Sequence, residues 1–156
     1  MEIASNVSIL NRHEIIAEAH ARIYIGENVH FQRDARIELG PGAQLYIGDS
    51  SWFGHNTTIS ALEEICIGKN CLFAPFSYIN DSNHQIAKAR LIKEQEWTSE
   101  SITIGDDVWQ GVGATILKGA KICDGAVIGA RSVVNKVVPA YEIWAGIPAR
   151  KIGERR

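Results

Sequence analysis

The sequence predicts an all-β protein built as a parallel β-solenoid, and three observations lead to this fold class. Aliphatic or aromatic residues return every six positions over most of the chain, the residue four positions after each of them is usually small, and 14 glycines are spread along the chain. A period of six fits neither the 3.6-residue turn nor the seven-residue repeat of helices, which so many glycines would also destabilise. An antiparallel sandwich would leave the period of six unexplained.

Pairs of an aliphatic residue and a glycine open the repeats. These pairs are Ile25-Gly26, Ile47-Gly48, Ile67-Gly68, Ile104-Gly105 and Ile128-Gly129. From Ile104 the period continues through Gln110, Ile116, Ile122, Ile128 and Val134, with the glutamine as the single polar residue. The small residues of the second pattern are Ala35, Ser51, Thr57, Cys71, Ser77, Ala114, Ala120, Ala126 and Ser132.

A unit with one inward aliphatic residue and one inward small residue cannot bury its own face. Units must therefore stack into a continuous core, three to a triangular coil, with backbone hydrogen bonds between coils about 4.8 Å apart. The small residues mark tight corners, and glycine or asparagine near a corner tolerates positive φ. We expect one solenoid domain over residues 1–156.

The largest break in the repeat lies between Ile79 and Ile104. It contains the run Asn80-Asp81-Ser82-Asn83-His84 and a charged stretch with Trp97. A solenoid tolerates insertions at its corners, and a long loop on a rigid scaffold is often functional. We therefore expect an active-site loop at about 80–103, an irregular capping coil over 1–22 and a basic C-terminal tail over 140–156.

Composition argues against several classes of function. The 16 Lys and Arg residues against 18 Asp and Glu residues give a formal net charge of −2, which provides no basic field for nucleic acid. No apolar run is long enough for membrane insertion and no secretory signal opens the chain, so we expect a cytoplasmic protein. Cys66, Cys71 and Cys123 lie in apolar patterns without CxxC spacing and are predicted to be buried thiols.

Three segments resemble the hexapeptide-repeat acyltransferases, specifically the branch of galactoside and maltose O-acetyltransferases. The segments are Ile67–Pro75 followed by His84, Ile104–Gly111, and Ile128–Lys136 closed by Ala145–Arg150. Together they cover roughly residues 65 to 152. Because the N-terminal helical segment of longer members is not expected here, the chain is similar to short members associated with surface-polysaccharide modification.

The resemblance implies a left-handed parallel β-helix and a homotrimer with three active sites, each in a cleft between neighbouring subunits. It also implies acetyl-CoA as co-substrate, lying along that cleft, and no metal. The implied reaction is direct transfer of the acetyl group to a hydroxyl of a sugar or saccharide acceptor, through a tetrahedral intermediate.

Transfer to a hydroxyl needs a general base, because an alcohol is a poor nucleophile toward a thioester until its proton is being removed. His84 matches the catalytic histidine of the family and is the candidate base. One of its ring nitrogens must be held by an acceptor so that the other faces the substrate. The alternatives for that acceptor are Asp81, Asn80, Glu94, Glu96 or a backbone carbonyl.

The resemblance also implies contacts to acetyl-CoA. A backbone amide within 109–113 is expected to stabilise the oxyanion, and the glycines there either admit the pantetheine arm or are ordinary corners. Arg150 falls where relatives meet the phosphate end of the co-substrate, and basic residues suit that polyanion. The expected contacts are Ala74, Trp109, Gly111, Gly113, Ala130, Asn135, Lys136 and Arg150.

Acceptor recognition departs from the galactoside-type pattern. Those members carry an asparagine and an acidic residue on the coil before the catalytic histidine, where this sequence has Gly54-His55-Asn56 and Ser60-Ala61-Leu62. Candidate acceptor contacts are His55, Asn56, Asn80, Asp81 and Trp97. Each has a structural alternative: outward solenoid residues for the first two, a turn for the next two, and a pin for the loop in the case of the tryptophan.

Three other functions are known for solenoids of this kind or would use the same fold. N-acetylation of an amino sugar, including a nucleotide-linked one, would use the same fold. A β-helical carbonic anhydrase would need three histidines around zinc, and no second histidine lies near His84 in the sequence. A non-enzymatic solenoid would need regular outward threonine ladders and no excursion.

Overall fold

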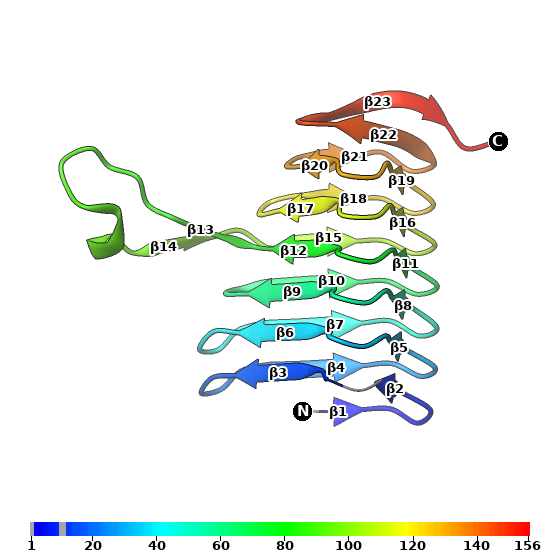
Figure 1. Cartoon of the computed structure of the whole chain (residues 1–156), viewed down its shortest axis with the longest axis horizontal. Coiled ribbons are helices and arrows are strands. Elements are labelled where there is room, and N and C mark those ends of the chain that lie inside the picture. The colour runs from blue at the N-terminus through cyan, green and yellow to red at the C-terminus, as the bar shows by residue number, and fades with distance from the viewer. Residues whose placement is uncertain (1, 10–11) are drawn as a thin grey trace.

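The computed structural model describes residues 2–9 and 12–156. Short β-strands wind three to a coil, and the coils stack in parallel from one end of the chain to the other (Figure 1). The strands of the stack form three sheets of seven, eight and six strands, here named A, B and C, and two further strands pair outside the stack. Within the described ranges, no helix is long and apolar enough to cross a membrane.

Sheet A contains β1 (Glu2–Ile3), β4 (Arg22–Ile25), β7 (Gln44–Ile47), β10 (Glu64–Ile67), β15 (Ile102–Ile104), β18 (Lys121–Ile122) and β21 (Val137–Val138). Sheet B contains β2 (Ser8–Ile9), β5 (His30–Phe31), β8 (Trp52–Phe53), β11 (Leu72–Phe73), β16 (Trp109–Gln110), β19 (Val127–Ile128), β22 (Glu142–Gly146) and β23 (Ala149–Glu154). Sheet C contains β3 (Glu14–Ala17), β6 (Arg36–Leu39), β9 (Thr58–Ala61), β12 (Tyr78–Asn80), β17 (Thr115–Leu117) and β20 (Val133–Val134).

Inward side chains stack in ladders along the solenoid, as the six-residue pattern predicts. On sheet B the rings of Phe31, Phe53 and Phe73 lie nearly parallel, with successive centroids 4.5 and 4.6 Å apart. The ladder continues through Gln110 and Ile128, and both side chains are buried. Each coil therefore buries its apolar side chains against the coils on either side.

The coils become narrower along the chain. Equivalent positions lie 22 residues apart at Glu27 and Asp49, but 18 apart at Asp106 and Asp124. The wide coils have four-residue strands in sheets A and C, such as β6, on which Ile37 and Leu39 both point inward. On sheet C the longer strands add an outward row, in register between coils, that consists of Ile16, Glu38, Ser60, Asn80 and Leu117.

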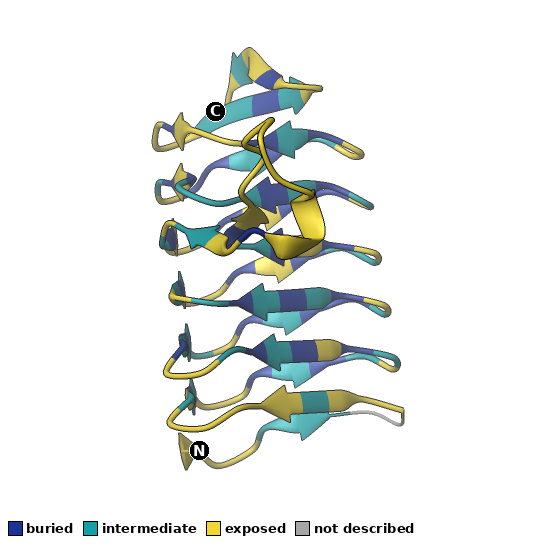
Figure 2. Ribbon diagram, turned by 90° about the vertical axis from the view of Figure 1, so that its left-hand side faces the viewer, coloured by how far each residue is buried: buried dark blue, intermediate teal, exposed yellow. Residues whose placement is uncertain are grey.

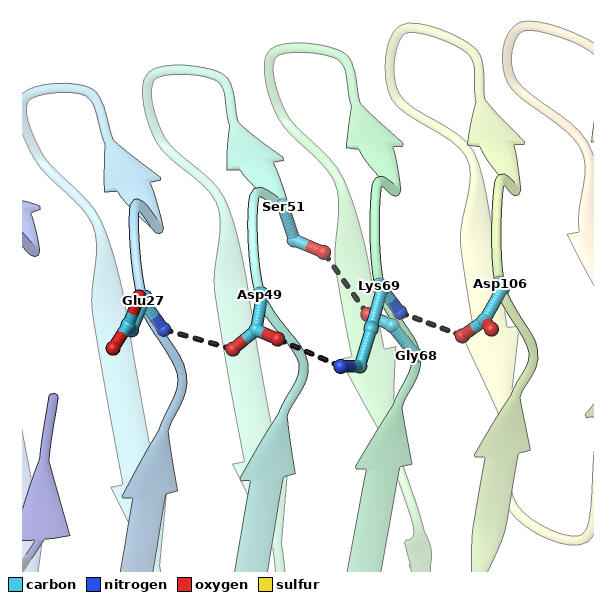
Figure 3. A network of polar contacts seen from close by, with 6 residues as sticks. All are labelled: Glu27, Asp49, Ser51, Gly68, Lys69 and Asp106. Atoms are coloured by element: carbon cyan, nitrogen blue, oxygen red, sulfur yellow. Dashed lines mark hydrogen bonds and ion pairs between the residues drawn. The ribbon is translucent and has the colours of Figure 1, made fainter.

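A polar ladder holds the corner between sheets A and B (Figure 3). Asp49 accepts hydrogen bonds from the amide of Glu27 at 2.9 Å and from Nζ of Lys69 at 2.7 Å. The amide of Lys69 donates in turn to Asp106, whose own amide donates to Asp124. Because every bond joins one coil to the next, the ladder fixes the register of the stack.

The described residues of the first coil, 2–9 and 12–22, follow the regular pattern of the stack, in contrast to the irregular capping coil expected over 1–22. β1, β2 and β3 pair in parallel with β4, β5 and β6. The residues Ile3, Ile9 and Ile15 keep the six-residue spacing, but no aliphatic–glycine pair marks its start. The coil was therefore missed because its turn lacks this pair, although its inward positions follow the repeat.

Residues 140–156 also differ from the expected tail, because β22 and β23 form an antiparallel hairpin over the last coil (Figure 1). Trp144 points inward with only 8% of its surface exposed, and its indole donates to Glu142 at 2.7 Å. Lys151 pairs with the same carboxylate at 2.7 Å. The hairpin thus covers the end of the core.

The three cysteines are free. Cys71 is buried and the other two are half-buried. Burial raises the pKa of Cys66 and of Cys71 to about 11. Both are therefore protonated at neutral pH, which makes them poor nucleophiles and metal ligands.

Candidate active site

The expected active-site loop is a β-hairpin, residues 82–99, that leaves the corner between sheets C and A (Figure 1). We call it the arm. Its strands are β13 (Ser82–His84) and β14 (Trp97–Ser99), which pair antiparallel, and a 3-10 helix, η1 (Ile92–Glu94), lies in the connection between them. The arm projects from the middle of the stack and is largely exposed (Figures 1 and 2).

The root of the arm is fastened by Asn80 and Asp81. The Asn80 amide group donates to the carbonyl of Ser82 at 2.9 Å, while its oxygen accepts from the amide and the hydroxyl of Ser82. Asp81 is completely buried, and its two oxygens accept from the amides of Leu62 and Glu63 at 2.7 and 2.9 Å. Both side chains are used to hold the arm, and contact of Asn80 and Asp81 with the acceptor stays a prediction.

The tip of the arm is ordered around Gln95. Its side chain is 6% exposed, accepts from the amide of Ala87 at 2.7 Å, and donates to the carbonyls of Ala87 and Arg90 at 3.0 Å each. No motif or spacing in the sequence singles out this residue. The hydrogen bonds of Gln95 hold together the connection between β13 and β14, so the arm has a defined shape of its own.

His84 lies on β13 directly opposite Trp97, and their ring centroids are 3.6 Å apart. Within the described part of the chain, its imidazole makes no hydrogen bond to another residue. The side chains of Asp81 and Asn80 make their hydrogen bonds to groups other than His84. The contact with Trp97 is what positions the ring in a single chain.

A groove of about 380 Å³ lies beneath the root of the arm, on the outer side of sheet C. Its residues are Ile16, Glu18, Glu38, Leu39, Gly40, Pro41, Ser60, Ala61, Leu62, Ser82 and Trp97. Trp97 thus contacts His84 on one side and the groove on the other. Of the candidate acceptor contacts, Trp97 is the residue that the fold places beside both His84 and the groove.

Another set of predicted residues gathers at the corner between sheets B and C. Ala74 and Gly111 each follow a sheet B strand and occupy the same position on successive coils. A Cβ on Gly111 would lie 2.7 Å from the amide nitrogen of Ala130, so close stacking of coils explains this glycine. Gly113 has φ of 66°, which explains the second glycine as the left-handed residue of the turn.

His55 and Asn56 lie one coil below Ala74 at the corner between sheets B and C. The ring of His55 packs edge-on against Phe76, with centroids 5.1 Å apart. Asn56 has φ of 56° and is the left-handed residue of its turn. Both therefore have structural roles at a corner other than the one that carries the arm.

The remaining co-substrate candidates lie toward the C-terminal end. Trp109 points outward from sheet B and is half exposed. Asn135 and Lys136 form the short turn between β20 and β21, and Nζ of Lys136 lies 5.2 Å from the centre of the Trp144 ring. Arg150 is on β23, opposite Ala145. Lys136 and Arg150 bring positive charge to the C-terminal end of the solenoid, and positive charge suits a nucleotide phosphate.

The fold separates the predicted site residues into two sets. His84 and Trp97 lie on the arm, which leaves the corner between sheets C and A, where the strands of sheet C end. Ala74, Gly111 and Gly113 lie at the corner between sheets B and C, where the strands of sheet C begin. Strands of sheet C lie between the two corners. One chain alone therefore does not bring the histidine to the glycine-rich turn.

The structure is thus a solenoid of six-residue units with one ordered arm that presents a histidine, which is the arrangement expected of solenoid acyltransferases. Residues 101–136 match the family model described as bacterial transferase hexapeptide (six repeats). The galactoside O-acetyltransferase of Escherichia coli is 34% identical over 143 residues, which are 92% of this chain and 68% of that protein. A probable acetyltransferase of Mycobacterium tuberculosis is also 34% identical, over 87% of this chain, but the chain spans only 45% of its length.

Among solved structures, a hexapeptide-repeat acetyltransferase from Vibrio cholerae has a TM-score of 0.75 and 27% identity, covering 85% of this chain and 74% of that one. Its complex with acetyl-CoA has a TM-score of 0.66 and 25% identity, covering 88% and 72%. These likenesses confirm the predicted left-handed parallel β-helix. The chain belongs to the hexapeptide-repeat acyltransferase family.

Proposed function

We propose that this protein transfers the acetyl group of acetyl-CoA to a hydroxyl of a saccharide, with His84 as general base. The observation that carries the proposal is the arm, which places His84 against Trp97 on a hairpin with a fastened root. The relatives support the donor and the reaction type, because they include a galactoside O-acetyltransferase and an acetyl-CoA complex. The free thiols suit a reducing compartment such as the cytoplasm.

In the proposed reaction, a ring nitrogen of His84 removes the proton of the acceptor hydroxyl as the oxygen attacks the thioester carbonyl carbon. The new C–O bond gives a tetrahedral intermediate whose negative charge rests on the former carbonyl oxygen. When the intermediate collapses, the C–S bond breaks. The proton held by His84 then goes to the departing thiolate, so the histidine returns to its neutral form.

The oxyanion needs a donor that is not already used. The amides of Trp109, Gly111 and Gly113 donate to carbonyls of other turns and coils. Val112 lies between the two glycines with nearly half of its surface exposed. We therefore assign the expected donor within 109–113 to the amide of Val112.

The separation of the two corners favours the expected homotrimer. If the arm of one subunit lies against the corner between sheets B and C of its neighbour, then His84 and the turn at Val112 face a common cleft. Acetyl-CoA would lie along that cleft, with its phosphates near Lys136 and Arg150 and its thioester near Ala74. Three such clefts arise from threefold packing.

The test is release of free CoA thiol, measured for wild type and His84→Ala with a methyl galactoside, the matching amino sugar and a nucleotide sugar as acceptors. We expect acceptor-dependent release that falls roughly 10² to 10⁴-fold in the variant, with CoA affinity unchanged. Asn83→Ala is the matched control, because it truncates the neighbouring position on the other face of the same strand. Full activity of His84→Ala, or no CoA binding by the wild type, would overturn the proposal.

A further inference from the structure

We infer that the groove beneath the arm, as the acceptor site of the proposed reaction, selects uncharged or amine-bearing acceptors over anionic ones. This inference rests on the proposed function and adds the charge of the acceptor. The groove volume of about 380 Å³ lies within the range of small-molecule sites, about 300 to 1,000 Å³.

The register of the arm directs His84 toward this groove. Side chains at alternate positions of a strand share a face, so Ser82 and His84 lie on the same face of β13, opposite Ser99 and Trp97 on β14. Ser82 and Trp97 line the groove. The face of the arm that carries the histidine is therefore the face that covers the groove.

The walls of the groove suit a sugar ring. Trp97, 54% exposed, offers an aromatic face on which the apolar side of a sugar can stack. Ser60 projects from the outward row of sheet C, and Ile16 supplies apolar surface from the same row two coils below. The groove thus combines one aromatic wall with a few polar groups, as expected for a site that fixes the orientation of its ligand.

The charged side chains of the groove are acidic. Glu18 and Glu38 line it, and among the residues that the structure describes no lysine or arginine does. Arg36 pairs with Glu38 and also with Glu14, at 3.0 Å, so one guanidinium is shared between two carboxylates. With Glu18 added, three carboxylates lie against one positive charge. Carboxylates accept hydrogen bonds from sugar hydroxyls and ammonium groups, and repel a uronate or a phosphate.

The first experiment compares two acceptors that differ in charge, methyl β-galactoside and methyl β-galacturonide, by thiol release at low salt. We expect kcat/KM to favour the uncharged glycoside by about tenfold, and the ratio to shrink at high salt. Glu18→Gln should reduce the preference, whereas Glu27→Gln at the corner between sheets A and B should leave it unchanged. Equal use of the two acceptors, or a preference unaffected by Glu18→Gln, would overturn the charge selection.

The second experiment fills the groove. Ser60→Trp should raise KM for methyl β-galactoside at least tenfold while CoA affinity stays unchanged, and Thr58→Trp, two positions earlier on the same face of β9, should have little effect. Oligomeric state is measured for both variants. An unchanged KM, or loss of activity that follows dissociation of Ser60→Trp into smaller species, overturns the acceptor site. The proposed function fails separately, if wild type shows no acceptor-dependent thiol release.

Discussion

Two corners of the same solenoid differ sharply. At the corner between sheets A and B, coil after coil repeats one pattern of side-chain-to-amide bonds, and the chain never leaves the stack (Figure 3). At the corner between sheets C and A, the repeat stops after Asn80 and resumes at Ile102, with the arm in between. The comparison shows that repetition holds the scaffold together, and that its single large interruption carries the candidate chemistry.

The two regions also differ in how they are held. A residue of the stack contacts the coils on both sides, whereas the arm depends on its root at Asn80 and Asp81 and on its own centre at Gln95. Damage to the stack should therefore appear as lost stability. Damage to the arm should appear mainly as lost transfer.

The largest stability difference is expected from truncation of an aromatic residue in each region. Phe53→Ala removes a fully buried ring stacked between two others and should lower the free energy of unfolding by about 3 to 5 kcal/mol. Trp97→Ala removes a half-exposed ring and should change the free energy of unfolding by less than about 1 kcal/mol. It should nevertheless slow transfer, because His84 loses its contact with the Trp97 ring. Urea unfolding and thiol release measure the two effects, and similar stability losses in both variants would contradict the comparison.

A smaller effect is expected where the two regions meet. Asp81→Ala leaves the amides of Leu62 and Glu63 without their acceptor and should destabilise the protein by about 1 to 3 kcal/mol. Transfer should slow as well, because the root of the arm loosens. The matched change at the other corner, Asp124→Ala, removes the acceptor of a single exposed amide and should leave transfer unchanged. Equal transfer rates in the two variants would show that Asp81 does not position the arm.

The smallest effect is a difference in pH dependence between Asp81 and Asp49. Burial raises the pKa of Asp81, against the opposing effect of its amide donors. The carboxyl of Asp81 therefore binds a proton more readily in the folded protein than in the unfolded chain. Its contribution to stability falls as the pH rises from the usual aspartate pKa of about 3.9 through the raised pKa of the folded protein. The hydrogen bond from Lys69, then the amide of Glu27, lower the pKa of Asp49, so its contribution is present above about 3.9 and is lost as the pH falls through the folded value.

Urea unfolding of wild type, Asp81→Asn and Asp49→Asn between pH 3 and 6 checks this difference. The free-energy change caused by each substitution should vary with pH in opposite directions. The same direction for both would mean that burial does not dominate at Asp81.

The sequence predicted the stack well because six-residue spacing is a direct consequence of how coils bury side chains. Even Gln110, the polar member of its run, is buried in the ladder, where its amide donates to the carbonyl of Ala114 at 2.6 Å. The first coil was missed only because Ile3 is followed by alanine instead of glycine.

The sequence was less informative about the site. Motif spacing identified His84 and the break in the repeat, but Asn80 and Asp81 have the composition of an exposed turn, and nothing local indicates that the carboxylate turns inward to Leu62 and Glu63. The groove could not be predicted because its walls come from three coils and the arm. Such a surface depends on which residues become neighbours after folding.

The narrowing of the coils along the solenoid offers evolution and protein engineering a separate way to change specificity. The two extra residues on the sheet C strands of the wide coils create the outward row with Glu38 and Ser60, which the shortest strands do not extend. Rebuilding every coil to an ideal eighteen-residue perimeter would keep the position of Leu117 in that row but remove the inward position that Leu39 and Ala61 occupy. Coil perimeter is thus a design variable that can change ligand preference without altering His84, although it changes the packing of the core as well.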